Sequence, residues 1–241
     1  MTSAISDIKA VQFRPARQRG ATRLGWLDSR HSFSFGDYYD PEHEGFRALR
    51  VINDDRVQPG GGFDLHPHED MEIISYLVSG ELQHKDTLGN GSVIHAGEVQ
   101  RMSAGTGIWH SEFNPSATEF VHFLQIWILP DRQGLKPSYD QKLVPDAAKA
   151  GRPRLIASRD GRDDSLTIHQ DAGVYALRLR RGERTALRLL PGRYAWVQVV
   201  AGSLMANGTP LGPGDGAALT DPGRLEFTGL DDTHVLIFDL A

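Results

Sequence analysis

Short apolar runs separated by glycine, proline, asparagine and aspartate recur along the whole chain. The clearest runs are rich in valine, isoleucine and aromatic residues and cover Phe46–Asn53, Met71–Val78, Phe120–Leu129, Val174–Leu179 and Tyr194–Val200. Their length and composition predict β-strands. The best helical candidate, Asp146–Ala150, is barely one turn long. Many short strands with frequent turns predict an all-β fold, built as an antiparallel sandwich or barrel.

Two stretches of the chain present the same order of elements. In the first half, YLVSGEL is followed by HAGEV and FLQIWIL; in the second half, QVVAGSL is followed by GPGDG and VLIFDL. Both patterns indicate a strand, a glycine turn, a second strand, a further turn and a closing apolar strand. The segment Pro130–Pro153 is polar and contains several prolines, as expected of a connector. We therefore predict two similar units, residues 1–135 and 136–241.

Composition excludes several classes of function. With 39% hydrophobic residues the chain can fill a core, and its net charge of −5 provides no basic field for nucleic acid. It has no cysteine, which rules out disulfides, zinc–thiolate sites, iron–sulfur clusters and a thiol nucleophile. The most apolar stretch, Val121–Leu129, is too short to span a membrane, and the first twenty residues lack the apolar core of a secretory signal. We expect a cytoplasmic protein.

Two pairs of potential metal ligands stand out, His66-Pro67-His68 and His110-Ser111-Glu112. Residues i and i+2 of a strand point to the same side, so each pair presents two donors together. Three imidazoles and one carboxylate suit iron, manganese, nickel, copper or zinc. Such a set would leave positions open for a substrate and a second small molecule. The alternative is that these are surface histidines at strand ends; His84 and His95, which lie close to turns, are expected to be solvated.

The residues around these pairs resemble the two cupin motifs. Gly60-x5-His66-x-His68-x3-Glu72 is similar to the first motif, and Gly97-x5-Ser103-x-Gly105 followed by His110-x3-Asn114 is similar to the second. The segments HSFSFGDYYDP, HPHEDMEIISYLVSGELQHKDTLGN and GEVQRMSAGTGIWHSEFNPS resemble the pirin family of bicupins. The likeness runs from about Val11 to the C-terminus and is closest to bacterial members described as quercetin 2,3-dioxygenases.

The resemblance implies two antiparallel jelly-roll barrels packed face to face, with a metal in the N-terminal one alone. Alignment of Gly80 with Gly202 places Arg188 and Leu190 where His66 and His68 stand, so the C-terminal copy lacks the ligand pair. The metal implied is one divalent transition metal, with Fe(II) favoured and nickel, manganese, copper and zinc left open. The family's two-barrel chain can act as a monomer.

The carboxylate ligand is ambiguous at this stage. The general cupin pattern implies Glu72, whereas the pirin branch implies Glu112, and spacing alone does not decide between them. We favour Glu112, which would also be the general base. The family's N-terminal segment implies that Phe33, Phe35, Tyr38 and Tyr39 wall an aromatic pocket, although aromatic residues in such a fold are more often core.

The function that the resemblance implies is a dioxygenase that acts on a flavonol such as quercetin. The enolate oxygen of the substrate would bind the metal, dioxygen would add across the heterocycle, and carbon monoxide would be released. The alternative is a metal- or redox-responsive module that binds a protein partner without turnover. A third possibility is another reaction of the cupin scaffold, because fold alone does not determine function.

Overall fold

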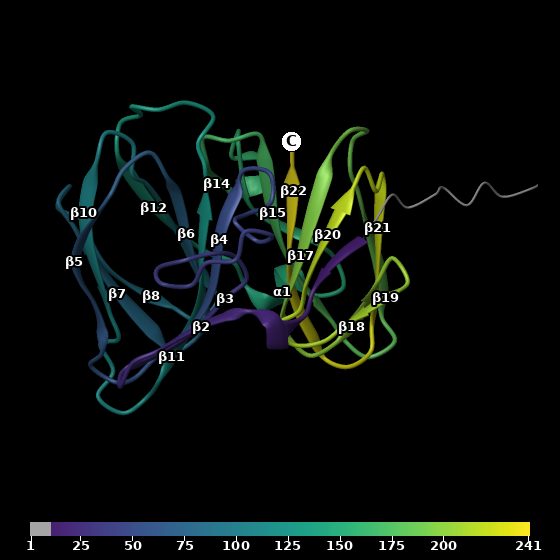
Figure 1. Ribbon diagram of the computed structural model, residues 1–241, viewed down its shortest axis with the longest axis horizontal. Helices are drawn as coiled ribbons and strands as arrows, with labels where there is room; N and C mark the ends of the chain where they lie inside the picture. The colour runs from purple at the N-terminus through teal and green to yellow at the C-terminus, as the bar shows by residue number, and fades with distance from the viewer. Residues whose placement is uncertain (1–10) are drawn as a thin grey trace, which may run out of the picture.

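The computed structural model describes residues 11–241, which form two β-sheet units lying side by side (Figure 1). The five strands predicted above are confirmed, with ends that differ by at most a few residues, and the helical turn is α1 (Asp146–Lys149). The other short helical turns are η1 (Ala16–Gln18) and η2 (Arg162–Asp164). In residues 11–241 no helix has the length and apolar character needed to cross a membrane.

The N-terminal unit is a seven-stranded sheet that faces a four-stranded sheet. In hydrogen-bonded order the larger sheet contains β12 (Ser138–Leu143), β9 (Glu98–Ser103), β6 (Glu72–Ser79), β11 (Val121–Ile128), β4 (Leu49–Val57), β3 (Leu27–His31) and β2 (Gly20–Arg23). The smaller sheet contains β5 (Gly62–His68), β10 (Ile108–Phe113), β7 (Glu81–Asp86) and β8 (Gly91–His95).

The C-terminal unit repeats this arrangement of seven strands facing four. The larger sheet contains β1 (Val11–Arg14), β20 (Gly216–Thr220), β17 (Tyr194–Ala201), β22 (Thr233–Leu240), β15 (Ala172–Leu179), β13 (Arg154–Ser158) and β14 (Leu166–Thr167). The smaller sheet contains β16 (Arg184–Arg188), β21 (Arg224–Gly229), β18 (Leu204–Ala206) and β19 (Thr209–Leu211). The predicted all-β bicupin fold is therefore confirmed. Each described unit has two separate sheets rather than one continuous ladder, so the barrels are not closed by hydrogen bonds.

The two large sheets pack face to face, and this contact forms a large hydrophobic core. It joins Ile52, Ile74 and Ile126 of the N-terminal unit to Val174 and Phe238 of the C-terminal unit, among others. Alternate residues of a strand face opposite sides of its sheet. The central strands β6, β11, β15, β17 and β22 are therefore buried on both sides. This explains why they read as nearly continuous apolar runs.

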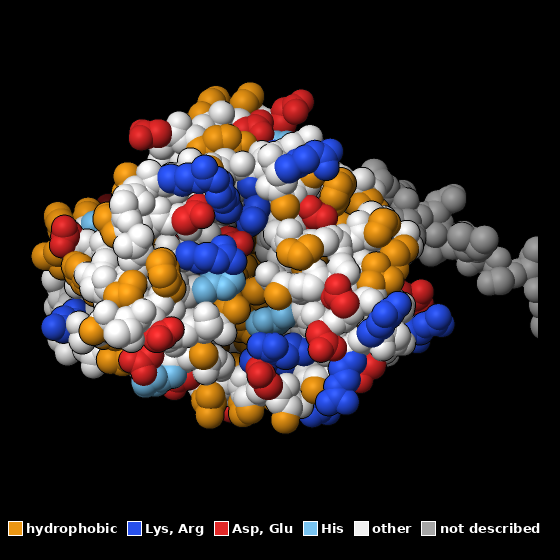
Figure 2. All heavy atoms as spheres, turned by 90° about the horizontal axis from the view of Figure 1, so that it is seen from below, with side chains coloured by type: hydrophobic (Ala, Val, Ile, Leu, Met, Phe, Trp, Pro, Cys, Tyr) orange, Lys and Arg blue, Asp and Glu red, His pale blue; other side chains and the backbone are white. Residues whose placement is uncertain are grey.

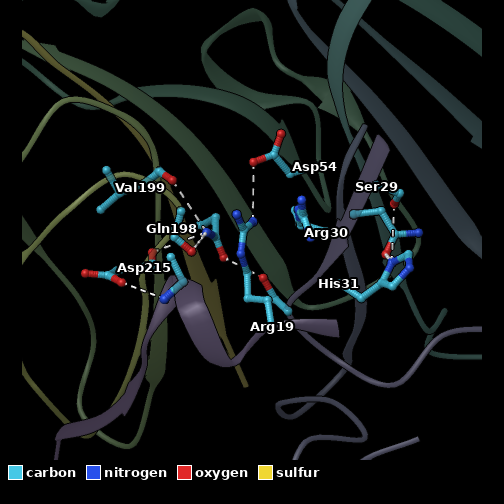
Figure 3. A network of polar contacts seen from close by, with 12 residues as sticks. Arg19, Ser29, Arg30, His31, Asp54, Gln198, Val199 and Asp215 are labelled. Atoms are coloured by element: carbon cyan, nitrogen blue, oxygen red, sulfur yellow. Dashed lines mark hydrogen bonds and ion pairs between the residues drawn. The ribbon is translucent and has the colours of Figure 1, made fainter. Parts of the chain in front are cut away.

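The beginning of the chain ties the two units together. Strand β1 joins β20 of the C-terminal unit, and β2 joins β3 of the N-terminal unit. Between them, the Ala16 amide donates to Asp215 Oδ1 over 2.7 Å, and Arg19 Nη1 lies 3.3 Å from Asp54 Oδ2 (Figure 3). Strand β12 follows residue 135 yet pairs with β9 of the N-terminal unit. The division at residue 135 stays a prediction, and hydrogen-bonded strands cross it.

Candidate metal centre

Three histidines meet inside the N-terminal unit, on two neighbouring strands of its smaller sheet. His66 and His68 lie on β5, and His110 lies on β10 directly opposite His66 in the antiparallel ladder. Because His66 and His68 are two residues apart, both face the same side of the strand. One nitrogen from each of the three rings lies within 4.8 Å of the others. The fold thus brings together the three histidines that the sequence predicts as ligands.

The hydrogen bonds around these rings leave nitrogen lone pairs directed into the cluster. His66 Nδ1 lies 2.6 Å from the Asp64 carbonyl oxygen, which can only accept, so His66 carries its proton on Nδ1 and has a lone pair on Nε2. His110 Nε2 is buried and has no hydrogen-bond partner within residues 11–241. An unpaired buried nitrogen is costly unless something binds it. These observations fit a metal ion among the three rings.

The protonation state also suits a metal. Burial first, and the neighbouring imidazoles second, lower the pKa of both His68 and His110 to about 3. Both rings are therefore neutral at physiological pH. Metal binding requires neutral imidazole, since a protonated nitrogen has no lone pair to donate.

The Glu112 carboxylate lies next to this cluster and is almost completely buried. It forms a second close group with His84 and His110, in which the ligand atoms are again within 4.8 Å. Its Oε1 accepts from Gln100 Nε2 (2.7 Å) and Ser75 Oγ (3.2 Å), and its Oε2 accepts from Gln125 Nε2 (2.7 Å). The Ser75 hydroxyl has one proton and also lies 2.9 Å from Gln125 Oε1, so the two side-chain amides are the main donors that orient the Glu112 carboxylate.

These donors come from one row across the larger sheet. Gln100 lies opposite Ser75, Ser75 opposite Gln125, and Gln125 opposite Asn53, on four adjacent strands. Cross-strand neighbours on one face are the pairs that interact most directly in a sheet. The isolated polar residues within otherwise apolar strands therefore mark the face that looks into the site. Sequence reasoning did not use this signal.

Glu72, the alternative carboxylate, has different partners. Its Oε2 accepts from Ser103 Oγ over 2.9 Å, and its Oε1 lies 3.0 Å from His169 Nδ1 of the C-terminal unit. It is absent from both histidine clusters in the described residues. Glu112 is thus the carboxylate that lies beside His110, while Glu72 links the two units.

The four predicted pocket aromatics are separated by the fold. Phe35 lines the cavity beside the histidines and packs edge-on against Trp127, with ring centroids 5.4 Å apart. Phe33 is buried against Trp196 of the C-terminal unit, at 4.7 Å. Tyr38 accepts a hydrogen bond from Arg14 Nη2, and Tyr39 is exposed and donates to Glu44. Of these four residues, Phe35 alone contributes to the cavity wall.

The cavity beside the histidines has a volume of about 80 Å³. Its lining combines apolar side chains with hydrogen-bonding side chains that the sequence alone did not reveal. The lining residues are Thr22, Leu27, Ser29, His31, Phe35, Asn53, Asp55, Phe63, His66, His68, Glu112, Gln125 and Trp127. His31 is held there between Asn53 Oδ1 and Thr22 Oγ1, at 2.7 and 2.8 Å (Figure 3 shows His31 beside Ser29).

A larger cavity of about 880 Å³ lies away from the histidine cluster, in the groove between the two units. Val78, Asp146, Arg178, Glu183 and His234 are among its lining residues. Seen from below, charged and histidine side chains gather around the middle of the molecule (Figure 2). Size alone does not identify the candidate site, because His66, His68 and Glu112 of the grouped donors line the smaller cavity.

Asp55 carries a buried carboxyl group at the smaller cavity. Burial raises its pKa to about 7; a hydrogen bond from Ser29 opposes the shift, and the Asp54 and Glu112 carboxylates add to it. The unfolded chain ionises an aspartate near pH 4. The folded protein therefore holds an extra proton between about pH 4 and pH 7 and loses stability as the pH rises through that interval.

Asp55→Asn is expected to remove this pH dependence. The difference in free energy of unfolding between the variant and the original chain should be more favourable to the variant at pH 8 than at pH 5, by about 2–3 kcal/mol. Urea unfolding of the metal-free protein at both pH values measures the difference. Asp28→Asn, which changes a half-exposed carboxyl on β3, is the control and should show no such gain. A pH-independent effect of Asp55→Asn would contradict the prediction.

His84 corrects a prediction made from sequence. It was expected to be solvated because it lies near a turn, but its ring is completely buried, stacked on Tyr139 and in contact with His110. The error arises because the ring faces the opposing sheet, where Tyr139 of β12 covers it. His95 is exposed, as predicted.

Comparison with known proteins confirms the resemblance in both units. The Pirin family profile matches residues 12–128, and a profile described as "Quercetinase C-terminal cupin domain" matches residues 155–240. A protein of Escherichia coli K12 named quercetin 2,3-dioxygenase is 46% identical over 230 residues, which are 95% of this chain and 98% of that protein.

Solved structures show the same likeness. The crystal structure of YhhW from Escherichia coli has a TM-score of 0.93 at 45% identity and covers 96% of this chain and 98% of its own. A structure described as bacterial pirin YhhW in complex with nickel(II), from the same organism, has a TM-score of 0.91 at 44% identity, with 96% and 99% covered.

Proposed function

Since this chain belongs to the pirin family, we propose that it is a metal-dependent dioxygenase that opens the heterocycle of a flavonol such as quercetin. The observation that carries the proposal is the group of three imidazoles whose nitrogens converge beside a buried carboxylate. The 46% identity with a protein named quercetin 2,3-dioxygenase supports the choice of substrate. In the proposed reaction quercetin and dioxygen yield a ring-opened ester and carbon monoxide.

We propose His66, His68, His110 and Glu112 as the ligands of one divalent transition metal. Nitrogen and oxygen donors accept several such metals. The proposal takes Fe(II) as the metal, and the nickel(II) complex of the Escherichia coli relative supports a divalent ion of this class. When bound, the metal supplies the redox and Lewis-acid chemistry by which a flavonol reacts with dioxygen.

Glu112 would act as the general base toward the flavonol hydroxyl. A carboxylate offers about four acceptor positions, and three of them are used by Gln100, Ser75 and Gln125. The position that remains lies on Oε2, which accepts a single hydrogen bond. A proton and a metal together need two positions, and the second opens when the single Ser75 hydroxyl proton is donated to Gln125 Oε1, 2.9 Å away, instead of to Glu112.

The walls of the cavity would orient the substrate. Phe35, Phe63 and Trp127 offer flat apolar surfaces to an aromatic ring and exclude water from the reacting atoms. The cavity of about 80 Å³ is smaller than the roughly 300–1,000 Å³ typical of ligand pockets. A three-ring flavonol must therefore displace Phe35 or leave part of itself outside.

The proposal includes action as a monomer, since one chain carries all four proposed ligands. It places the protein in the cytoplasm, where reducing conditions keep iron ferrous. A metal- or redox-responsive module that binds a protein partner uses the same four residues and differs in having no turnover.

A metal series separates these two functions. Apoprotein is loaded without oxygen with Fe(II), Ni(II), Mn(II), Cu(II) or Zn(II), quercetin is added, and the flavonol absorbance is followed after air is admitted. The proposal predicts catalytic loss of the band with Fe(II), many turnovers per protein. Tight binding of these metals with no loss of quercetin in any sample would reject the dioxygenase and favour the binding module.

A further inference from the structure

A buried chain of two hydrogen bonds runs from Asp86 through His84 to His110. His84 Nε2 lies 3.0 Å from Asp86 Oδ2, and His84 Nδ1 lies 3.4 Å from His110 Nδ1. The side chains of His84 and Asp86 are fully buried, and His110 is almost fully buried. On the paired strands β7 and β10, Asp86 lies opposite His110 and His84 lies opposite Glu112. The register of the ladder thus places the three residues next to one another.

At one end of these linked hydrogen bonds, the Asp86 carboxylate acts as the acceptor. Its Oδ1 accepts from the Leu88 and Asn90 amides at 2.9 and 3.0 Å, and its Oδ2 accepts from Asn90 Nδ2 at 2.8 Å. Burial opposes ionisation, but hydrogen bonds from His84 and Asn90 outweigh it and lower the pKa of the Asp86 carboxyl. An ionised carboxylate can only accept, so His84 must carry a proton on Nε2.

The proton on His84 Nε2 determines the state of the next ring. A neutral imidazole with a proton on one nitrogen has a lone pair on the other, so His84 Nδ1 accepts. His110 must then donate from Nδ1, which leaves its lone pair on Nε2. That nitrogen is the buried atom for which the described part of the chain provides no hydrogen-bond partner. The chain of hydrogen bonds therefore accounts for the orientation in which His110 faces the metal centre.

We propose that His84 and Asp86 are positioning residues that hold His110 in the Nδ1-protonated tautomer and so direct its Nε2 lone pair at the metal. The proposal rests on the metal centre proposed above. Outer hydrogen bonds of this kind raise the metal affinity of a histidine site by about 10–100-fold. For His66, the Asp64 backbone carbonyl plays the same positioning role, because it accepts a hydrogen bond from Nδ1 directly.

Asp86→Asn is expected to reverse the tautomers of both rings. The Asn oxygen must stay where two backbone amides now meet Oδ1, so its NH₂ group takes the place of Oδ2 and faces His84, while the Asn90 side-chain amide must turn to present its oxygen. His84 Nε2 would then accept, its Nδ1 would donate, and His110 would keep its proton on Nε2. Replacement of one Asp86 oxygen by an NH₂ group would thus put a proton on His110 Nε2, the nitrogen proposed to bind the metal.

The test combines a tautomer measurement with metal binding. Long-range proton–nitrogen NMR of ¹⁵N-histidine-labelled apoprotein assigns the protonated nitrogen of His110 without any metal or substrate. Nickel(II) affinity is measured by competition with a chelator. Glu81→Gln is the matched control, because Glu81 lies on the same strand and pairs with an exposed histidine, His95, at 3.3 Å.

We expect His110 to be protonated on Nδ1 in the original chain and on Nε2 in Asp86→Asn. The nickel dissociation constant should rise about 10–100-fold in Asp86→Asn and stay unchanged in Glu81→Gln. A proton on His110 Nε2 in the original chain would overturn the proposal, as would an Asp86→Asn variant with unaltered tautomer and affinity.

A second variant covers the case in which Asp86→Asn does not fold, and it also tests the role of His84. His84→Gln should weaken nickel binding by the same 10–100-fold. Loss of binding as complete as in His66→Ala would make His84 a ligand and would overturn the positioning role. If the original chain bound no metal, the metal centre itself would fail, while the NMR measurement would still decide the tautomer.

Discussion

His66→Ala is expected to abolish quercetin turnover and to lower metal affinity more than about 100-fold. The loss should exceed the 10–100-fold effect of outer hydrogen bonds, since a direct ligand is removed. The fold should persist, because the His66 side chain is only partly buried and lies on the smaller sheet, away from the core between the units. Metal content after dialysis and the rate of quercetin loss measure both effects.

His95→Ala is the matched control for this variant. It removes an imidazole from β8 of the same sheet, where the ring is exposed and outside both histidine clusters. Its metal content and rate should equal those of the original chain. Full turnover by folded His66→Ala would contradict the assignment of the site.

Glu112→Gln should lower kcat by about 100- to 10,000-fold, the range attributed to a positioned general base. The replacement has the same shape but is neutral and places an NH₂ group against the donors Gln100, Ser75 or Gln125, which now meet only acceptor oxygens. The base is lost and the hydrogen-bond pattern around it is broken. Steady-state kinetics of protein loaded to equal metal content measures the effect.

Glu72→Gln tests the other carboxylate under the same conditions. Glu72 contacts Ser103 and His169 between the units, so this variant should keep its kcat and lose stability instead. The opposite result, with kcat lost in Glu72→Gln and kept in Glu112→Gln, would exchange the roles of the two residues.

The strands could be predicted because β6, β11, β15, β17 and β22 are buried on both sides and read as continuous apolar runs. The N-terminal strand β1 could not, since its pairing with β20 joins residues about two hundred positions apart. No local pattern specifies such a partner. For the same reason the sequence did not reveal that β12 returns to the first unit.

The sequence predicts the part of the site in which metal-ligating residues occur in pairs along one strand. His66 and His68 share a face by their spacing, and the structure places His110 beside them. The groups that orient them come from other strands. Gln100 and Gln125 look like ordinary polar residues in sequence, and their role depends on a cross-strand register that only the folded sheet provides.

The most direct test of the central claim is the yield of carbon monoxide per quercetin consumed by Fe(II)-loaded protein. Quercetin is mixed with the protein without oxygen, a known amount of oxygen is admitted, and carbon monoxide is measured in the gas phase while the flavonol absorbance falls. Ring opening by a dioxygenase predicts one carbon monoxide for each quercetin and each dioxygen consumed, and none with His66→Ala. Loss of quercetin without carbon monoxide, or an equal yield from His66→Ala, would contradict the account.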